Sequence, residues 1–370
     1  MHGKIRLSKS SIGQREKAAV LKVLDSEFLG MGEEVQAFEK EIKSYLKTDK
    51  EVICVNTGTS ALHLALSALD VGTGDEVLVP SLTYVASYQA ISATGAKPIS
   101  CEVNENTLFI DVEDARSKVT KNTKVIMPIH YASNSLDMSE VYSLAKEFNL
   151  RVLEDAAQAF GCKRNNDFIG KDGDIICFSF DGIKNITSGE GGAILSSDEE
   201  FIQRVKDSRL LGVEKDTEKR YNKERSWDFD VLHQGFRYHM SNIMAAIGRE
   251  QLNRIEEFRV KRQEVVQTYL NNLDVIEEIQ FLDFNYDEII SHIFVIKATK
   301  RDELREYLLK SGVECGVHYK PNHLLSKYKI KNSLMITEGL YESILTLPCH
   351  YDLTNEDLEY IIDVINKFYK

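Results

Sequence analysis

Lys184 is the residue whose position best suits covalent chemistry. It lies in a short polar loop, Asp181-Gly-Ile-Lys184, between an apolar run that ends at Ser179 and the Gly-rich turn Gly189-Glu-Gly-Gly192. An amine held at the end of an apolar strand loses hydration, which lowers its pKa and leaves it nucleophilic toward an aldehyde. This position predicts a Schiff-base lysine. The competing interpretation is a solvated loop lysine, the usual fate of this residue type.

A second group of residues can bind an anion. The segment Asn56-Thr-Gly-Thr-Ser60 follows a predicted strand and opens a predicted helix, where free N–H groups and the helix dipole point the same way. Gly58, Thr59 and Ser60 form this candidate phosphate seat, and the hydroxyl of Ser179 can complete it. Plain helix capping by Thr59 or Ser60 is the competing interpretation. The seat lacks the lysine of a nucleoside triphosphate loop, so we do not expect a nucleoside triphosphate there.

Three more candidate side chains follow strand ends. Asp155, in Glu154-Asp-Ala-Ala-Gln158, ends an apolar run, where open parallel sheets bind their ligands. Its carboxylate can pair with a protonated ring nitrogen, and Gln158 can reach a neighbouring phenolic oxygen. Tyr84, in Pro80-Ser-Leu-Thr-Tyr84, can lie flat on a heteroaromatic ring. Helix capping by Asp155 and core packing of Tyr84 are the alternatives.

These candidate groups complement one another. Together they supply an amine for a Schiff base, a carboxylate for a pyridinium nitrogen, an amide, a flat aromatic face and a phosphate seat. This combination matches pyridoxal 5′-phosphate (PLP). The sequence therefore predicts PLP as the cofactor and no metal site.

The elements that must position these residues alternate along the chain from residue 52. The expected strands are Val52–Val55, Val77–Val79, Pro98–Cys101, Val125–Pro128, Val152–Glu154, Ile175–Phe180 and Ala193–Leu195. Helix-period segments lie between them near 60–69, 83–94, 112–118 and 138–148. This alternation predicts an α/β fold with a mainly parallel central sheet and helices on both faces. We expect the last two strands, which flank the Lys184 loop, to pair directly.

The chain is long enough for two domains. We expect a large PLP-binding domain at 1–254 and a smaller α/β domain at 255–370. Two helices precede the sheet; the first is opened by a capping-box pattern at Ser11, and the second carries the stripe Val35, Phe38, Ile42 and Leu46. A long helix over 239–271 connects to a tail with predicted strands at His292–Ala298, Val313–His318 and Leu345–Pro348.

Composition narrows the class of protein. The formal net charge is −12 and no basic cluster interrupts it, which argues against nucleic-acid binding. No apolar run approaches the length of a membrane span. Six scattered cysteines without C-x-x-C spacing are expected to be buried thiols. The N-terminus has no signal-peptide pattern, so we expect a cytoplasmic protein.

At these motifs the chain resembles the nucleotide-sugar aminotransferases, the DegT/StrS-type branch of the fold-type-I PLP enzymes. The resemblance runs from about Leu29 to the C-terminus. The motifs that carry it are Gly58-Thr-Ser-Ala-Leu-His-Leu-Ala, Pro80-Ser-Leu-Thr-Tyr, Glu154-Asp-Ala-Ala-Gln, Ser179-Phe-Asp-Gly-Ile-Lys184, Gly189-Glu-Gly-Gly, Gly235-Phe-Arg-Tyr-His-Met-Ser-Asn242, Gly316-Val-His-Tyr-Lys-Pro-Asn-His323 and Leu347-Pro-Cys-His350. It implies a fold-type-I PLP-transferase fold and aminotransferase activity.

The resemblance also implies a role for each matching residue. Lys184 corresponds to the Schiff-base lysine, Asp155 to the partner of the pyridine nitrogen, Gln158 to a neighbour of the ring oxygen and Tyr84 to the residue on the ring face. The residues implied to hold the phosphate are Thr59, Ser60 and Ser179. Some family members carry histidine in place of the lysine and are sugar dehydratases. Lys184 therefore favours transamination.

Two segments depart from the family pattern. The family commonly has Asn in the place of Arg237 and Arg in the place of His239, and that Asn reaches the cofactor phosphate of the partner subunit. Arg237 can form a charge-assisted bond to the same phosphate, so we include it among the cofactor-binding residues. The segment Tyr131-Ala-Ser-Asn134 stands where relatives often read Tyr/Leu-Gly-Gln. It borders the expected substrate mouth.

The resemblance implies L-glutamate as amino donor, a nucleotide-linked keto sugar as acceptor and a homodimer with active sites at the subunit interface. His318, Tyr319 and His323 lie in the segment that the family uses near the sugar nucleotide, and surface or core-capping roles are their alternatives. We expect dTDP-4-keto-6-deoxy-D-glucose to be aminated to dTDP-4-amino-4,6-dideoxy-D-glucose, for polysaccharide or O-antigen synthesis. Amination at sugar carbon 3, a UDP-linked sugar, a PLP-dependent sugar dehydratase and a regulatory protein that retains the fold are the alternatives.

Overall fold

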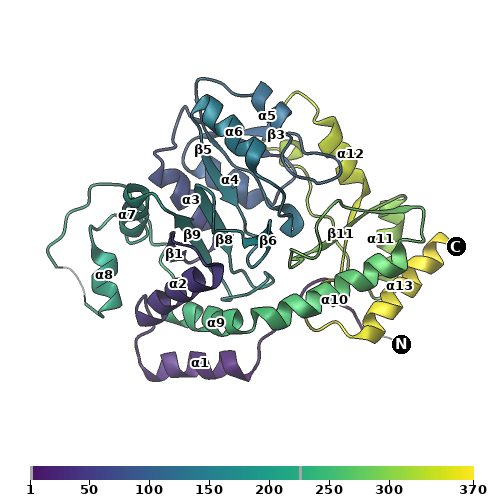
Figure 1. Cartoon of the computed structure of the whole chain (residues 1–370), viewed down its shortest axis with the longest axis horizontal. Coiled ribbons are helices and arrows are strands. Elements are labelled where there is room, and N and C mark those ends of the chain that lie inside the picture. The colour runs from purple at the N-terminus through teal and green to yellow at the C-terminus, as the bar shows by residue number, and fades with distance from the viewer. Residues whose placement is uncertain (1–2, 225–226) are drawn as a thin grey trace.

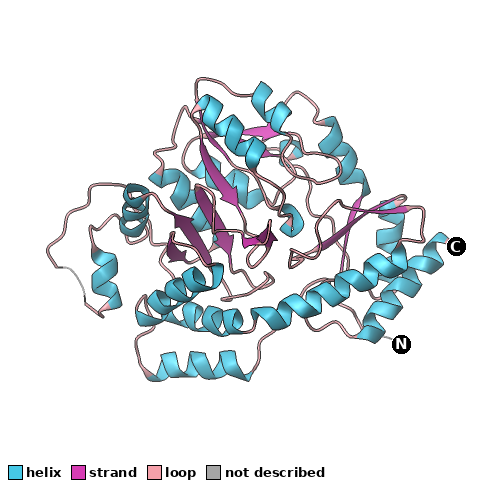
Figure 2. Cartoon of the chain, in the orientation of Figure 1, coloured by secondary structure: helices cyan, strands magenta, loops and turns pink. Residues whose placement is uncertain are grey.

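A seven-stranded sheet lies at the centre of the chain, of which a computed structural model describes residues 3–224 and 227–370. The strand order is β1-β9-β8-β5-β4-β2-β3, and all neighbouring pairs are parallel except the two that β9 makes. The strands are β1 Glu51–Val55, β2 Glu76–Pro80, β3 Lys97–Cys101, β4 Thr123–Ile126, β5 Arg151–Asp155, β8 Ile175–Ser179 and β9 Gly192–Ser196. Figure 2 shows helices on both sides of this sheet, which confirms the predicted α/β fold.

Successive side chains of each strand point into two different apolar cores. In β1, Ile53 and Val55 enter one core, and Val52 and Cys54 enter the other. The helices over the first face are α3 (Gly58–Ala68), α4 (Val85–Ala93) and α7 (Glu199–Ser208), and those over the second are α2 (Glu33–Leu46), α5 (Val112–Ser117), α6 (Ser139–Phe148) and α9 (Asn242–Asn253). Burial on both faces explains why the strands read as continuous apolar runs.

Two helices precede the sheet, as predicted. The apolar stripe of α2 is buried at Val35, Phe38, Ile42 and Leu46. α1 (Gln14–Asp25) packs against α9 below the sheet (Figure 1). The predicted capping box at Ser11 is wrong, because Gly13 precedes the helix and donates its N–H to the Glu16 carboxylate at 2.8 Å. The Ser11 carbonyl instead accepts a hydrogen bond from Gln251 at 2.9 Å.

The C-terminal elements form a smaller α/β layer around their own apolar core. Its members are the antiparallel strands β10 (Ile279–Phe281), β11 (Phe294–Ala298) and β12 (Ile344–Leu347) with α10 (Ile255–Leu273), α11 (Arg301–Lys310) and α13 (Asn355–Tyr369). In Figure 1, α10 runs from α9 to these elements, and both ends of the chain lie on their side of the molecule. The boundary between residues 254 and 255 stays a prediction.

Two predictions about this half are wrong. The helix over 239–271 is two helices, because the backbone leaves the helical conformation at Arg254 with φ −104° and ψ 2°. The segment 313–318 is not a strand, since it makes only isolated bridges, Val313 to Ile5 and Gly316 to Thr346. After Gly316 the backbone pairing with β12 ends, and His318 and Tyr319 line the cavity described below.

A buried polar cluster explains a helix that the sequence does not predict, α8 (Asp216–Tyr221). Arg209 is fully buried and donates to the Glu39 carboxylate at 2.7 Å and to the Tyr221 hydroxyl at 2.7 Å. A buried charge of this kind is tolerated only when it is paired. The cluster fastens the segment after α7 to α2.

All six cysteines are free and buried, which confirms the prediction of buried thiols. Burial raises the pKa of the Cys54 and Cys177 thiols well above the usual range, so neither is a reactive thiolate. Within residues 3–224 and 227–370, no helix has both the length and the apolar composition that crossing a membrane requires.

Candidate active site

A cavity of about 480 Å³ opens at the carboxyl ends of β1, β2, β5 and β8, where a parallel sheet is expected to bind its ligand. The predicted site residues that line it are Gly58, Thr59, Tyr84, Asp155, Gln158, Ser179, Lys184, His318 and Tyr319. The predicted residues that lie outside its lining are Ser60, Arg237 and His323. The fold therefore brings most of the predicted groups to one place.

Lys184 occupies the loop between β8 and β9. The loop closes on itself through hydrogen bonds from the Phe180 N–H to the Gly191 carbonyl at 2.8 Å and from the Ser188 N–H to the Phe180 carbonyl at 2.9 Å. Burial lowers the pKa of the Lys184 amine, against the opposing attraction of Asp155 and Asp181. A larger uncharged fraction makes this amine a better nucleophile.

Asp155 is the last residue of β5 and is 5% exposed. Its carboxylate accepts hydrogen bonds from the Ser87 hydroxyl at 2.8 Å and from the Ala157 N–H at 3.2 Å. Within the described chain it forms no ion pair closer than 4 Å, and burial raises its pKa. A buried carboxylate with neutral partners is suited to a cationic N–H of a ligand, because that cation would offset the cost of its desolvation.

The start of α3 meets the end of β8 across the floor of the cavity. The first two N–H groups of the helix, those of Gly58 and Thr59, have no acceptor within it. A Cβ atom on Gly58 would lie 2.7 Å from the Ser179 Cβ atom and 2.8 Å from its hydroxyl oxygen, so only glycine allows this approach. Free N–H groups beside a hydroxyl form an anion seat.

Ser60 does not face the cavity, which corrects the prediction that it holds phosphate. Its hydroxyl donates to the Asn56 side-chain oxygen at 2.7 Å and accepts from the Thr57 N–H at 3.1 Å. The Ser60 N–H is capped by the Thr57 hydroxyl at 2.9 Å. Ser60 therefore stabilises the turn that presents Gly58 and Thr59.

An amide and two tyrosines form one wall. Gln158 accepts the Ala132 N–H at 2.7 Å and donates to the Tyr319 hydroxyl at 3.1 Å. The Tyr84 ring, 57% exposed in the single chain, lies 5.5 Å from the Tyr319 ring between centroids. Tyr131, which is fully buried behind this wall and does not line the cavity, donates its hydroxyl to the His318 carbonyl. The predicted contacts of Gln158 and Tyr84 with the cofactor stay predictions.

The two predicted histidines have different positions. His318 lines the cavity and its Nδ1 atom pairs with the Thr346 hydroxyl at 2.8 Å; burial, reinforced by the Lys184 charge, lowers its pKa to about 4. His323 is 2% exposed and both its ring nitrogens are engaged, with the Ser81 hydroxyl at 2.6 Å and the Glu338 carboxylate at 3.1 Å. The prediction that His323 lines the cleft is therefore wrong, because it joins the end of β2 to the C-terminal layer.

Arg237 does not reach the cavity of its own chain. Its backbone runs beside Asn56, just before the phosphate seat, but its side chain lines a separate hollow of about 260 Å³ with Trp227 and His239. A direct bond from Arg237 to a cofactor in the same chain is thus not supported. The predicted bond to the partner subunit's cofactor stays a prediction.

The cavity contains further residues that the sequence analysis did not select; the polar ones are Thr57, Thr83, Ser87, Asp181, Glu190 and His292. Ser87 lies one helical turn after Tyr84, and Asp181 and Glu190 share the Lys184 loop, so proximity to the selected residues could have indicated them. His292 had no local signal, because it is 108 positions from the Lys184 that it contacts.

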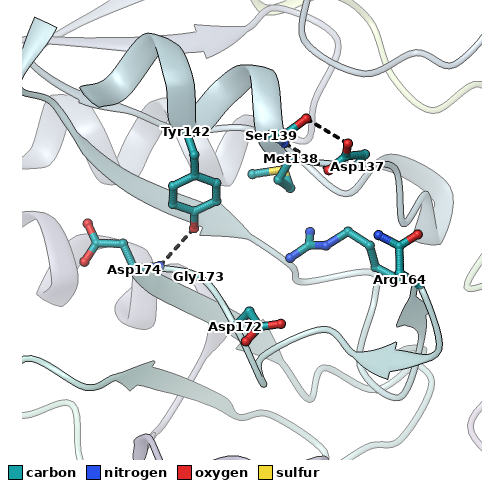
Figure 3. Close-up of a pocket in the computed structure, with 9 residues that line it drawn as sticks. Asp137, Met138, Ser139, Tyr142, Arg164, Asp172, Gly173 and Asp174 are labelled. Atoms are coloured by element: carbon teal, nitrogen blue, oxygen red, sulfur yellow. Dashed lines mark hydrogen bonds between the residues drawn. The ribbon is translucent and has the colours of Figure 1, made fainter. Parts of the chain in front are cut away.

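A second hollow, of about 520 Å³, lies between the start of α6, the turn at Arg164 and the segment just before β8 (Figure 3). Its lining includes the aspartates Asp137, Asp172 and Asp174. Tyr142 and Arg164 also line it and reach the buried Glu154, at 2.8 Å and 3.4 Å. None of the predicted site residues lines this hollow, so its larger volume does not make it the active site.

Residues 10–366 match the DegT/DnrJ/EryC1/StrS aminotransferase family. The chain belongs to this family. GDP-perosamine synthase of Escherichia coli O157:H7 is 35% identical over 363 residues, which cover 97% of each chain. Aminotransferase TlmJ of Streptoalloteichus hindustanus superposes with a TM-score of 0.92 at 29% identity, over 99% of this chain and 98% of that one. A Streptococcus pneumoniae protein solved in its PLP form gives a TM-score of 0.90 at 28% identity, over 99% and 100% of the two chains.

PLP is the cofactor of this DegT/DnrJ/EryC1/StrS aminotransferase, and the cavity fits it on three counts. Asp155 offers a buried carboxylate without a cationic partner within ion-pair distance in the described chain. Gly58 and Ser179 make an anion seat that any larger residue at position 58 would fill. Lys184 presents an amine with a lowered pKa to the same space.

Proposed function

We propose that this aminotransferase moves an amino group from L-glutamate to a keto sugar linked to a nucleoside diphosphate. The observation that carries the proposal is the meeting of Lys184, Asp155 and the α3 anion seat in one cavity. When bound, PLP supplies an electron sink for the carbon that loses its proton. The sugar acceptor is supported by the relative GDP-perosamine synthase, which is 35% identical and is named for a nucleotide-linked sugar.

The chain's own residues bind, orient and move protons. We assign the Asp155 carboxylate to the ring N–H of the cofactor, and the Gly58 and Thr59 N–H groups with the Ser179 hydroxyl to its phosphate. Lys184, whose pKa is lowered by burial, accepts the proton from the α-carbon of the donor and returns a proton to the sugar carbon in the second half-reaction. Lys184 and Asp155 line the same cavity, which supports assigning both proton transfers to Lys184.

We propose that His318 and Tyr319 contact the sugar nucleotide. Both line the cavity, and His318 is uncharged near neutral pH because burial lowers its pKa to about 4. The first acceptor to test is dTDP-4-keto-6-deoxy-D-glucose, with dTDP-4-amino-4,6-dideoxy-D-glucose as product in polysaccharide or O-antigen synthesis. The corresponding GDP-linked sugar is the second, because a relative at 35% identity is named for a GDP-linked sugar.

We further propose a cytoplasmic homodimer whose active sites lie at the subunit interface. An exposed apolar patch supports it, formed by Leu211, Trp227, Phe229, Val231 and Leu232. Trp227 is 90% exposed in the single chain, which is unusual for the largest apolar side chain unless a partner covers it. Arg237 lies beside this patch, where it can point to a second subunit.

The first experiment tests the covalent site. The purified protein is mixed with PLP, and we expect a visible absorbance band that L-glutamate bleaches. Borohydride should fix the cofactor onto Lys184, as mapped by peptide mass spectrometry, and K184A should lose both the band and the label. K171A is the matched control, because Lys171 is a surface residue paired with Asp167 at 2.6 Å. A label elsewhere, or undiminished sugar turnover by K184A, would refute the proposal.

The second experiment tests the acceptor. The glutamate-treated enzyme receives dTDP-, GDP- and UDP-linked keto sugars in turn, and products are analysed by mass and NMR. An amino sugar with nitrogen at carbon 4 supports the proposal, and nitrogen at carbon 3 would correct the position. Loss of water from the sugar without uptake of nitrogen would identify a dehydratase. A protein that binds PLP but transforms no sugar would indicate a regulatory role.

A further inference from the structure

His292 contacts the reactive amine from a distant part of the chain. Its Nε2 atom lies 3.5 Å from Lys184 Nζ, and the residue is 3% exposed. Burial, reinforced by the charge of Lys184, holds the pKa of His292 well below the usual range, so the imidazole is uncharged. Among the described residues the Nδ1 atom of this ring is buried and has no hydrogen-bond partner, so Nε2 is the ring atom that faces the Lys184 amine. Nε2 pairs with that amine as donor or as acceptor, according to the tautomer.

The backbone of His292 is fixed on both sides. Its N–H donates to the Ser133 hydroxyl at 2.9 Å, and its carbonyl accepts from the Arg262 guanidinium at 3.1 Å. The Ser133 hydroxyl also contacts the carbonyls of Gln158 and, at 2.8 Å, of Ile290. The Ser133 side chain thus connects Gln158, in the wall of the cavity, to His292, which contacts Lys184.

Ser133 occupies a costly backbone conformation to do this. Its φ is 73°, in the left-handed region that favours glycine. A glycine would adopt this turn more easily but would supply no hydroxyl. The contacts of that hydroxyl with three separate backbone groups are what serine adds at this position.

The lysine side of the contact is anchored to the same segment. Asn185, the residue after Lys184, donates its amide to the carbonyls of Phe160 and Ile290, each at 3.0 Å. The Lys184 loop and the His292 segment therefore share Ile290 as a common support. Their separation is set by this shared anchor.

We propose that His292 is a positioning residue that holds the Lys184 amine toward the cofactor, and that Ser133 keeps His292 in place for this task. The inference rests on the proposed role of Lys184. A displacement of about 1 Å in a reacting group can reduce a rate roughly 100-fold, so a single hydrogen bond to a flexible amine has a measurable effect. His318 also lines the cavity, but its Nδ1 atom pairs with the Thr346 hydroxyl at 2.8 Å, and within the described chain His292 is the histidine whose ring nitrogen contacts Lys184 Nζ.

The test compares two neutral replacements of similar size. Glutamine can place its side-chain oxygen near the Nε2 position of histidine, whereas asparagine reaches only the Nδ1 position. We measure the rate at which saturating PLP becomes attached to cofactor-free protein, together with the visible circular dichroism of the holoenzyme. H292N should slow attachment by about 10- to 100-fold and change the dichroism, and H292Q should stay within roughly threefold of the wild type.

The matched control pair is H350Q and H350N. His350 is also buried, at 5% exposure, and its Nε2 atom contacts a carbonyl, that of Arg6 at 3.1 Å, but it does not line the cavity. Both control variants should attach PLP at the wild-type rate. If H292N does so as well, or if H292Q and H292N slow attachment equally, His292 has no positioning role.

Ser133 provides a second, milder test. S133A removes the hydroxyl alone, and we expect attachment to slow by about three- to tenfold, with H292N and S133A less than additive in the double variant because they act through one contact. An unchanged rate in S133A would overturn its part of the proposal. In every variant the borohydride-fixed cofactor is mapped by peptide mass spectrometry. Cofactor fixed away from Lys184 in the wild type would refute the proposed function. Cofactor on Lys184 together with a wild-type attachment rate in H292N would refute only this inference.

Discussion

At the scale of single residues, the cavity combines groups whose charge is set by burial. Lys184 has a lowered pKa and Asp155 a raised one, both chiefly because water is excluded. Each charge state costs free energy unless a partner of opposite sign is present. PLP carries both a ring nitrogen and an aldehyde, so one ligand satisfies the two residues.

Two histidines, His318 in the cavity and His239 in the separate hollow with Arg237, make the stability of the fold depend on pH. Burial lowers the pKa of both His239 and His318 to about 4. In the unfolded chain a histidine titrates near about 6.5. Between these values the unfolded state binds more protons than the folded state, so the stability contributed by the neutral histidines is fully present above about pH 6.5 and is lost as the pH falls toward 4.

We therefore expect the free energy of unfolding to fall by on the order of a few kcal/mol between neutral pH and about pH 4.5. Urea titrations across this range measure it. H318Q removes one of the groups and should flatten the pH slope by at most about 1.4 kcal/mol per pH unit. Carboxylates with a lowered pKa, such as Glu154, titrate at more acidic pH, so they do not account for the loss of stability between neutral pH and about pH 4.5. An unchanged slope in H318Q would contradict the assignment.

At the scale of elements, the site depends on close contact between a helix start and a strand end. α3 approaches β8 so closely that Gly58 has no room for a Cβ atom, whose nearest neighbours would be Ser179 atoms. Part of that contact is with the Ser179 Cα atom at 3.3 Å, which no rotamer change can remove. The free N–H groups of the seat are therefore aimed by packing of backbone against backbone.

G58A should displace the first turn of α3 and weaken PLP binding by about tenfold or more, since several phosphate contacts shift together. Equilibrium titration of cofactor-free protein with PLP measures the change. G339A is the matched control. Gly339 lies in α12 (Met335–Ser343), and a Cβ atom added to it would meet no other atom within 4 Å. Normal affinity in G58A would show that the seat does not require this close approach.

The strands and the central part of the site could be predicted from sequence because local signals suffice for them. β-branched runs mark strands buried on both faces, and Asp155 and Lys184 follow such runs directly. The predictions that failed concern residues whose surroundings are set by partners elsewhere in the sequence. The environment of His323 is set by Ser81 and Glu338, and that of His292 by Ser133. α8 is held by polar burial of Arg209 and shows no apolar period.

At the scale of the whole molecule, one chain leaves the proposed site incomplete. None of the arginines within residues 3–224 and 227–370 lines its cavity, although the proposed sugar-nucleotide substrate carries phosphates. Arg237 does not line this cavity; it lines another hollow, beside the exposed patch around Trp227. A homodimer would cover the patch and bring Arg237 of one subunit toward the cofactor of the other. Two copies would then form two complete sites by symmetry.

Mixing two inactive variants tests this arrangement. K184A lacks the reactive amine and R237A lacks the crossing guanidinium, so each homodimer should have low activity. In a mixed dimer one site carries both lesions, while the other combines Lys184 from one chain with Arg237 from its partner. Random exchange of equal amounts should therefore restore about a quarter of wild-type activity, since half of the dimers are mixed and each has one intact site. If Arg237 acts within its own chain, every site retains a lesion and mixing restores nothing, whatever the mass in solution.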